Sequence, residues 1–364
     1  MVMADRPDVR TASLPVAAIT VVGLAESLVN GLARVPFRRP WQGPDSATEN
    51  LGRAVTRQVV RSFMGYSMGL PIEEFRSMEK ALDRICSVVM PPFVERVDGV
   101  DITSDTIAGV SGLWCRRREP APDAEPARGT ILYLHGGGYI GTSPMMYSAF
   151  AASLARGTSC DVFVADYRLA PEFPFPAGVH DAADVYAALI ERGVDPHTLV
   201  VAGDSGGGGL ATSLMAMLPE RDLPAPAALV LFSPEIDLDL DHPSITDNAA
   251  RDILPWNVPV TPYLHGVQPE DARVSAVFAP PDPERFPPTF VCAGGDEMFR
   301  DGIRDYVRTL DAAGVQVHYV EAPAMFHVFP ILMPWAAASH DVVGHLEQFV
   351  TRHLRTGHRT STAA

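Results

Sequence analysis

The stretch that decides the fold is VVAGDSGGGGL, Val200 to Leu210, in which one serine stands among five glycines. An apolar run precedes it and LATSLMAML, a helix-like segment, follows. Glycine loses more conformational freedom on folding than any other residue, so five of them need a backbone reason. A flexible linker is the alternative, but the flanks are strongly apolar. The pattern G-x-S-x-G between a strand and a helix predicts a nucleophile, Ser205, on a sharp turn whose neighbours must be small.

Apolar runs of strand length recur on both sides of this turn, and helix-length segments separate most of them. Such alternation predicts an α/β fold with a mostly parallel central sheet and helices on both faces. The continuously apolar composition is typical of strands buried on both faces. The expected strands lie in residues 130–137, 160–167, 198–203, 228–233, 288–295 and 315–322, and residues 94–102 and 107–117 read as an antiparallel opening pair.

The N-terminal quarter has a different pattern. Residues 1–92 carry apolar positions at three-to-four spacing, which predicts helices, and the PPF of Pro91 to Phe93 is expected to end them. We therefore divide the chain into an N-terminal helical region, 1–92, and an α/β catalytic domain, 93–364. The most apolar segment, Leu14 to Ala33, is interrupted by Glu26 and Asn30 and has a poor positively charged leader, so neither a cleaved signal nor a spanning helix is predicted.

Composition limits the partners. The formal net charge is −15, which disfavours nucleic acid because phosphate binding requires a basic face. The four cysteines, widely spaced and without a CxxC pair, are expected to be small buried side chains in a reducing compartment rather than a disulfide frame or a metal site. A cytoplasmic protein with no stable membrane insertion is the default, although a membrane-surface helix stays open.

The remaining catalytic groups are expected at other strand ends. HGGG, His135 to Gly138, follows a predicted strand and offers backbone N–H groups for an oxyanion, to which the N–H of Gly206 would add. In the order serine, acid, histidine, His327 follows the last predicted strand, and the preceding strand end offers several acids. We prefer Asp296 over Glu297 and Asp301 because it comes directly after the Gly-Gly turn.

These residues together resemble the hormone-sensitive-lipase family of α/β-hydrolases, the bacterial family IV esterases. The resemblance covers roughly residues 95 to 350 and rests on HGGG at 135–138, DYRLAPE at 166–172, GDSGGG at 203–208, SPEIDL at 233–238, GGDEMFRD at 294–301 and MFHVF at 325–329. It implies that Ser205 is the nucleophile, His327 the base and Asp296 its partner. It also implies an oxyanion hole made by the amides of Gly137, Gly138 and Gly206.

The resemblance further implies a cap over the site, formed by the first helices and an insertion at about 239–271. It implies an ion pair between Arg168 and Glu172 as well. The chain departs from the family at Gly206, where alanine is usual, at Glu235, where an aromatic residue is usual, and at Val328, where glycine is common. Glu235, Trp256 and Val328 are therefore the candidate substrate-pocket residues, and Glu235 lies near the pocket or faces solvent.

The predicted function is a serine hydrolase, a carboxylesterase or acetyl-hydrolase that cleaves carboxylic esters with short-to-medium acyl chains. It needs no metal and no organic cofactor, and its partner is a small-molecule ester; monomer and homodimer both stay open. Two alternatives remain. The same groups could act on a lactone, an amide, a carbamate or a natural-product ester, or the fold could serve as a non-catalytic ligand receptor. Fold and triad indicate the class of chemistry better than they indicate the substrate.

Overall fold

The computed structural model describes residues 9–118, 127–255, 258–278 and 281–354. An eight-stranded sheet forms its centre, with strands in the order β1-β2-β4-β3-β5-β6-β7-β8. The strands are β1 Val100–Ile107, β2 Val110–Arg117, β3 Thr130–Leu134, β4 Asp161–Ala165, β5 Leu199–Asp204, β6 Ala228–Phe232, β7 Thr289–Gly294 and β8 Val317–Ala322. Seven of the eight lie where the sequence predicts strands; β1 shares only residues 100–102 with its predicted range, 94–102, because residues 94–98 form the end of helix α3, Ile72–Asp98.

The sheet is mostly parallel. β3 to β8 pair in parallel, whereas β1 and β2 form an antiparallel pair whose second strand runs antiparallel to β4. β5 and β6 are buried along their whole length, because helices cover both faces of the sheet. Parallel pairing places the carboxyl ends of β3, β5, β7 and β8 at one edge, and the polar loops that follow these strands meet there.

Helices pack in two layers on the sheet. α4 and α11 contact each other on one face, and α5 and α6 contact each other on the opposite face. The helices and 3₁₀ turns are α1 Leu14–Arg34, η1 Val35–Arg38, α2 Ala47–Ser67, α3 Ile72–Asp98, α4 Ser148–Thr158, α5 Ala177–Glu191, η2 Pro196–Thr198, α6 Ser205–Met217, η3 Pro219–Arg221, α7 Pro243–Asp247, α8 Thr261–Leu264, η4 Ala276–Phe278, α9 Arg300–Ala312, α10 Phe329–Leu332 and α11 Ala337–His353. The chain has the α/β-hydrolase architecture that the sequence predicts.

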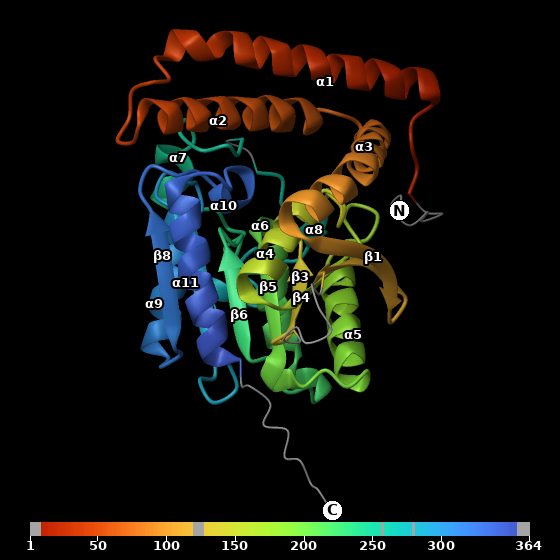
Figure 1. The fold of residues 1–364 in the computed structure, drawn as a ribbon, viewed down its shortest axis with the longest axis vertical. Coiled ribbons are helices and arrows are strands. Elements are labelled where there is room, and N and C mark those ends of the chain that lie inside the picture. Colours follow the sequence, from red (N-terminus) through yellow and green to blue (C-terminus); the bar gives the residue numbers. More distant parts are fainter. Residues whose placement is uncertain (1–8, 119–126, 256–257, 279–280, 355–364) are drawn as a thin grey trace, which may run out of the picture.

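The N-terminal helices lie across one end of this sheet, with α1 and α2 side by side (Figure 1). The prediction that Pro91 to Phe93 end the helical part is wrong, because α3 continues through both prolines to Asp98. Proline removes one hydrogen bond and crowds the preceding turn, but Val94 beyond the prolines is fully buried and holds the last turns in place. The helix ends at Gly99, which has the left-handed conformation typical of a C-terminal cap.

The outermost helix is also the most apolar. Among the described residues, Leu14–Phe37 is the one helical segment long and apolar enough to cross a membrane, and 17% of its most apolar window is buried. Leu14, Ile19 and Val22 on α1 are exposed. All four cysteines are free; Cys115, Cys160 and Cys292 are buried as predicted, whereas Cys86 on α3 is partly exposed.

Candidate active site

The turn between β5 and α6 carries Ser205, the first residue of the helix. Its φ is +51°, a left-handed conformation that is strained for any residue except glycine. The glycines around it are required by close backbone contacts: a Cβ on Gly207 would overlap the carbonyls of Leu134 and His135 at the end of β3. The structure thus explains the glycine cluster as a tight strand-to-helix turn that presents one serine, as predicted.

The second group is His327, in the loop after β8. Its Nε2 lies 2.9 Å from Oγ of Ser205, and the two side chains come from positions 122 residues apart. The imidazole is 2% exposed, and the ring of Phe299 contacts it edge-on at 5.1 Å between centroids. A buried, hydrogen-bonded serine–histidine pair is the arrangement by which an imidazole takes the proton of a nucleophilic hydroxyl.

The carboxylate behind the imidazole is Glu297, not the predicted Asp296. Oε2 of Glu297 lies 3.7 Å from Nδ1 of His327, an ion-pair contact longer than a hydrogen bond, and its side chain is fully buried. Asp296 points to the outer side of the turn, where Oδ1 lies 3.5 Å from Nε of Arg251. Neighbouring residues in a turn project in different directions, and the tertiary structure selects the second acid.

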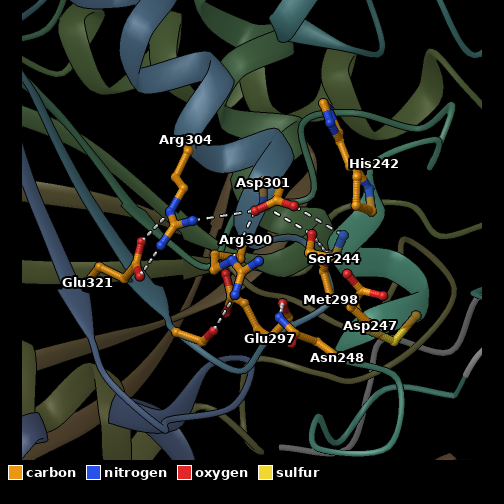
Figure 2. A network of polar contacts seen from close by, with 12 residues as sticks. His242, Ser244, Asp247, Asn248, Glu297, Met298, Arg300, Asp301, Arg304 and Glu321 are labelled. Atoms are coloured by element: carbon orange, nitrogen blue, oxygen red, sulfur yellow. Dashed lines mark hydrogen bonds and ion pairs between the residues drawn. The ribbon is translucent and has the colours of Figure 1, made fainter.

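Figure 2 shows the contacts that hold the turn carrying Glu297. Nδ2 of Asn248 donates to the carbonyl of Glu297 at 2.9 Å, and Oγ of Ser244 donates to the carbonyl of Met298 at 2.6 Å. The N–H of Ser244 in turn donates to Oδ2 of Asp301 at 3.1 Å. Ser244 of α7 and Asn248 at the end of α7 therefore hold the loop that carries Glu297. Asp301 takes part in these structural contacts and does not lie beside His327.

Several buried carboxylates surround the histidine. Burial opposes protonation of His327, but Glu297, then Asp252 and Glu235, outweigh it and raise the pKa of the imidazole above its usual value. Burial likewise raises the pKa of Glu297, and the neighbouring imidazole partly counters this. The environment therefore favours the imidazolium that forms when the histidine accepts a proton.

The predicted oxyanion loop lies beside the serine. The N–H of Gly136 is occupied, since it donates to Oδ1 of Asp204 at 2.9 Å. Gly137 and Gly138 have φ values of +124° and +60°, backbone conformations that residues with a side chain rarely adopt. A Cβ on Gly206 would lie 2.9 Å from the N of Tyr139, so the loop and the first turn of α6 are in close contact.

Asp204 connects this loop to the turn of the nucleophile. It is buried and also accepts hydrogen bonds from the hydroxyls of Tyr133 at 2.7 Å and Tyr147 at 2.8 Å. Burial raises the pKa of Asp204 to about 6, and these hydrogen bonds oppose the rise. A carboxylate with three donors is satisfied in the interior, so Asp204 fixes the loop of Gly136 relative to Ser205.

The substrate-pocket candidates have different outcomes. Glu235 is buried, donates its N–H to the carbonyl of Ser205 at 2.9 Å, and has a pKa raised to about 7 by burial. Of the two alternatives for Glu235, a solvent-facing side chain is therefore wrong. Val328 is buried at φ +49° and donates to Oγ of Ser233 at 3.0 Å. Trp256 lies outside the described residues.

Sequence reasoning missed two anchoring residues, Asp252 and Arg76. The buried carboxylate of Asp252 accepts hydrogen bonds from the N–H groups of Ile253, Met298 and His327, which join the acid loop to the histidine loop. No local pattern marks Asp252, because all its partners except Ile253 are distant in the sequence. The only sequence signal for Asp252 is that a charged residue stands in the long segment between β6 and β7.

Arg76 of α3 joins the N-terminal helices to the oxyanion loop. Buried, it forms ion pairs with Glu79 at 2.7 Å and with Glu172 at 2.6 Å, and it donates to the carbonyl of Ile140 at 2.6 Å. The expected pairing of Arg168 with Glu172 is therefore wrong. Arg168 pairs with Asp181 at 2.8 Å instead, because Glu172 pairs with Arg76 of α3.

No metal site accompanies this arrangement in the part of the chain that the structure describes: no group of three or more His, Cys, Asp or Glu side chains is placed to hold an ion. The chemistry available from the described side chains is that of a nucleophilic serine, a histidine base and a buried carboxylate. These groups are the components of acyl transfer in the Ser-His-acid arrangement.

Comparisons with known proteins agree with this architecture. The family model for the alpha/beta hydrolase fold matches residues 131–331. The chain is 36% identical over 228 residues to an acetyl-hydrolase of Streptomyces hygroscopicus, covering 62% of this chain and 74% of that protein. It is 29% identical over 280 residues to an esterase of Acinetobacter venetianus, covering 76% and 88%.

Among solved structures, the chain is similar to an esterase from the bacterial hormone-sensitive lipase family. The TM-score is 0.73 at 27% sequence identity, and the match covers 86% of this chain and all of that one. Fold, family model and relatives point to the same class of protein. The chain belongs to the alpha/beta hydrolase fold family and is an ester-cleaving enzyme of its bacterial hormone-sensitive-lipase group.

Proposed function

We propose that ester hydrolysis proceeds through an acyl-enzyme on Ser205, with His327 as general base and Glu297 as the carboxylate that orients and stabilises it. The observation that carries this assignment is the 2.9 Å contact between Nε2 of His327 and Oγ of Ser205, made in a buried site. Glu297 replaces Asp296 in this role because Glu297 is the acid that lies behind the imidazole.

The mechanism follows from these positions. His327 takes the proton of Ser205 as Oγ attacks the ester carbonyl carbon, and the carbonyl oxygen becomes an oxyanion. The tetrahedral intermediate collapses, the C–O bond to the alcohol breaks, and the imidazolium returns the proton to the leaving alcohol. Water then attacks the acyl-enzyme with His327 again as base, releasing the carboxylic acid and restoring the serine. No step of this sequence needs a cofactor.

The N–H groups of Gly137, Gly138 and Gly206 are the proposed oxyanion donors. Support comes from the occupied N–H of Gly136, which leaves the next two glycines of the loop, and from the close approach of Gly206 to that loop. Backbone donors fixed before the reaction stabilise the developing charge without reorganisation, and removing one donor typically costs about 10²–10³ in rate.

The proposed substrates are carboxylic esters with short-to-medium acyl chains. The acetyl-hydrolase among the relatives supports the short end of this range. We further propose that the N-terminal helices and residues 239–271 form the cap that limits the acyl chain, with Glu235 and Val328 in the pocket. The anchoring of α3 to the oxyanion loop through Arg76 supports a cap that is fixed over the site.

Partners and location belong to the same proposal. The chain acts on small esters rather than nucleic acid, which its formal charge of −15 disfavours. Four free cysteines support a reducing, cytoplasmic environment. A homodimer is compatible with the exposed apolar face of α1.

Two observations bear on the alternative functions. Glu235, a buried carboxylate next to the serine, favours a specialised ester as the second candidate substrate. The paired Ser205 and His327 disfavour a receptor role.

The test is hydrolysis of p-nitrophenyl acetate, butyrate, octanoate and palmitate by the wild type and by Ser205→Ala. We expect activity on the short esters that is lost in the variant. A wild type inert on all four but labelled at Ser205 by a fluorophosphonate would support the specialised substrate. A wild type that hydrolyses none of the esters and is not labelled at Ser205 by the probe would overturn the proposal and favour the receptor function.

A further inference from the structure

A cavity of about 200 Å³ lies between the N-terminal helices and the loops after β7 and β8. Its walls contain four arginines and a single carboxylate: Arg39, Arg53, Arg57 and Arg251 with Asp296. We call it the Arg251 cavity. Neither Ser205 nor His327 lines it, so it is distinct from the proposed catalytic site.

The charge of the Arg251 cavity is opposite to that of the chain. The protein carries a net charge of −15, yet four arginines line this one space. Near these arginines, Asp45 pairs with Arg53 at 2.7 Å, Glu49 also interacts electrostatically with Arg53, and Asp296 contacts Arg251. Like charges around one cavity repel, and a bound anion would reduce this repulsion.

Three of the four arginines are also held in position before any ligand arrives. Arg53, whose side chain is 12% exposed, is fixed by Asp45 and Asn50. Arg57 donates to the carbonyl of Arg251 at 3.3 Å, and Nη2 of Arg251 donates to Oδ1 of Asn248 at 2.6 Å. Preordered donors lose little conformational entropy on binding, and the planar guanidinium matches the geometry of carboxylate and phosphate oxygens.

The ion pair between Arg251 and Asp296 is the contact that a bound anion could replace. Their 3.5 Å contact is long, and the arginine side chain is 53% exposed, so the pair contributes little in water. A small anion in the cavity would compete with Asp296 for the guanidinium. The exchange would take place next to the catalytic loops, because Asp296 precedes Glu297 and Arg251 precedes Asp252.

We propose that the Arg251 cavity binds a small oxyanion, a carboxylate or a phosphate group, through Arg57 and Arg251 with support from Arg53. The site does not depend on the proposed catalytic roles, since binding is measured without turnover. Two sources share this chemistry: a carboxylic acid such as an ester-hydrolysis product, and a phosphate-bearing metabolite. Acetate and inorganic phosphate represent them.

The experiment is isothermal titration calorimetry of the full chain with sodium phosphate and, separately, sodium acetate, at constant ionic strength. We expect saturable binding at one site in at least one arm. Phosphate alone would identify a phosphate site, acetate alone a carboxylate site, and both the shared oxyanion chemistry. Heats that do not saturate in either arm would overturn the proposal.

Variants separate this site from general attraction to charge. Arg57→Gln and Arg251→Gln should each weaken binding by about tenfold or more, the scale of one lost charge-assisted hydrogen bond. Asp296→Asn should tighten it, because the competing carboxylate is gone. The matched control is Arg273→Gln, an exposed arginine paired with Asp271 elsewhere on the surface.

The control should bind as the wild type does. Equal affinity of Arg251→Gln and Arg273→Gln would overturn the proposal, and so would weaker binding by Asp296→Asn. Because the Arg251 side chain is half exposed, its replacement preserves the fold even where Arg57→Gln does not. Thermal unfolding of each variant checks this.

Discussion

Oδ1 of Asp252 accepts a hydrogen bond from the backbone N–H of His327 at 2.9 Å. The other oxygen, Oδ2, accepts from the N–H of Met298 at 2.7 Å, one residue beyond Glu297. A single buried carboxylate thereby joins the loop of the histidine to the loop of its acid. The carbonyl of Asp252 accepts a hydrogen bond in turn from Arg61 of α2 at 2.7 Å, so the N-terminal helices contribute to the same junction.

Asp252 is therefore expected to position the histidine. In Asp252→Ala three buried N–H groups lose their acceptor, and each unsatisfied group costs about 1–3 kcal/mol. We expect a lower melting temperature and a fall in kcat of about tenfold or more, with a smaller change in KM. Asp252→Asn retains one acceptor oxygen and should recover part of both. Equal kcat for wild type and Asp252→Ala would contradict this role.

The choice between the two adjacent acids gives the sharpest test of the site. Replacing the acid of a Ser-His-acid triad lowers kcat on the order of 10⁴-fold, because the imidazole loses its orientation and its charge partner. Glu297→Gln should show a loss of that kind with p-nitrophenyl butyrate. Asp296→Asn is the matched control and should stay within about threefold of wild type, because Asp296 contacts Arg251 and not His327. The reverse result would restore Asp296 as the partner.

Gly206→Ala tests the close contact between α6 and the oxyanion loop. The added Cβ would lie 2.9 Å from the N of Tyr139, so the loop must move away from the serine. If one N–H donor is displaced, kcat should fall by about 10²-fold. Gly65→Ala, on α2 with open space around the new Cβ, is the control and should leave kcat unchanged. Full activity in Gly206→Ala would show that the loop tolerates the methyl group.

Glu235 should influence the pH dependence. Its negative charge is one of those that raise the pKa of His327, and the base acts in its neutral form, so activity falls as pH drops through that raised pKa. Glu235→Gln removes the charge, lowers the pKa of the imidazole, and should move the acidic limb of the kcat/KM profile to lower pH. Glu220→Gln, exposed on η3, is the control. A shift to higher pH would contradict the assignment.

Arg76 should matter for stability. Arg76→Met leaves Glu79 and Glu172 without their cation, and breaking a buried ion pair in this way costs about 3–5 kcal/mol. Denaturant unfolding should report this loss. Arg118→Met is the matched control, because its pairs with Glu95 and Asp101 are exposed to solvent and contribute little to stability. Equal losses in the two variants would mean that α3 is held by packing alone.

The sequence by itself determined the sheet, the serine and the histidine. Alternation of buried strands with helices is a local pattern, and it predicts the six parallel strands β3 to β8. The turn of Ser205 was readable because the glycines that a strained strand-to-helix turn requires lie next to it in the chain. His327 was readable because a catalytic histidine follows the last strand, and parallel pairing brings that strand end to the same edge as β5.

Tertiary structure decided what local pattern cannot carry. Asp296 and Glu297 are adjacent and chemically alike, and only the path of the turn, fixed by Asn248 and Asp252 from another loop, sets which one reaches His327. The predicted end of α3 at Pro91 is wrong because the burial of Val94, beyond the prolines, outweighs their local effect on the helix. Contacts between residues distant in the chain leave no periodicity, and a sequence pattern therefore cannot reveal them.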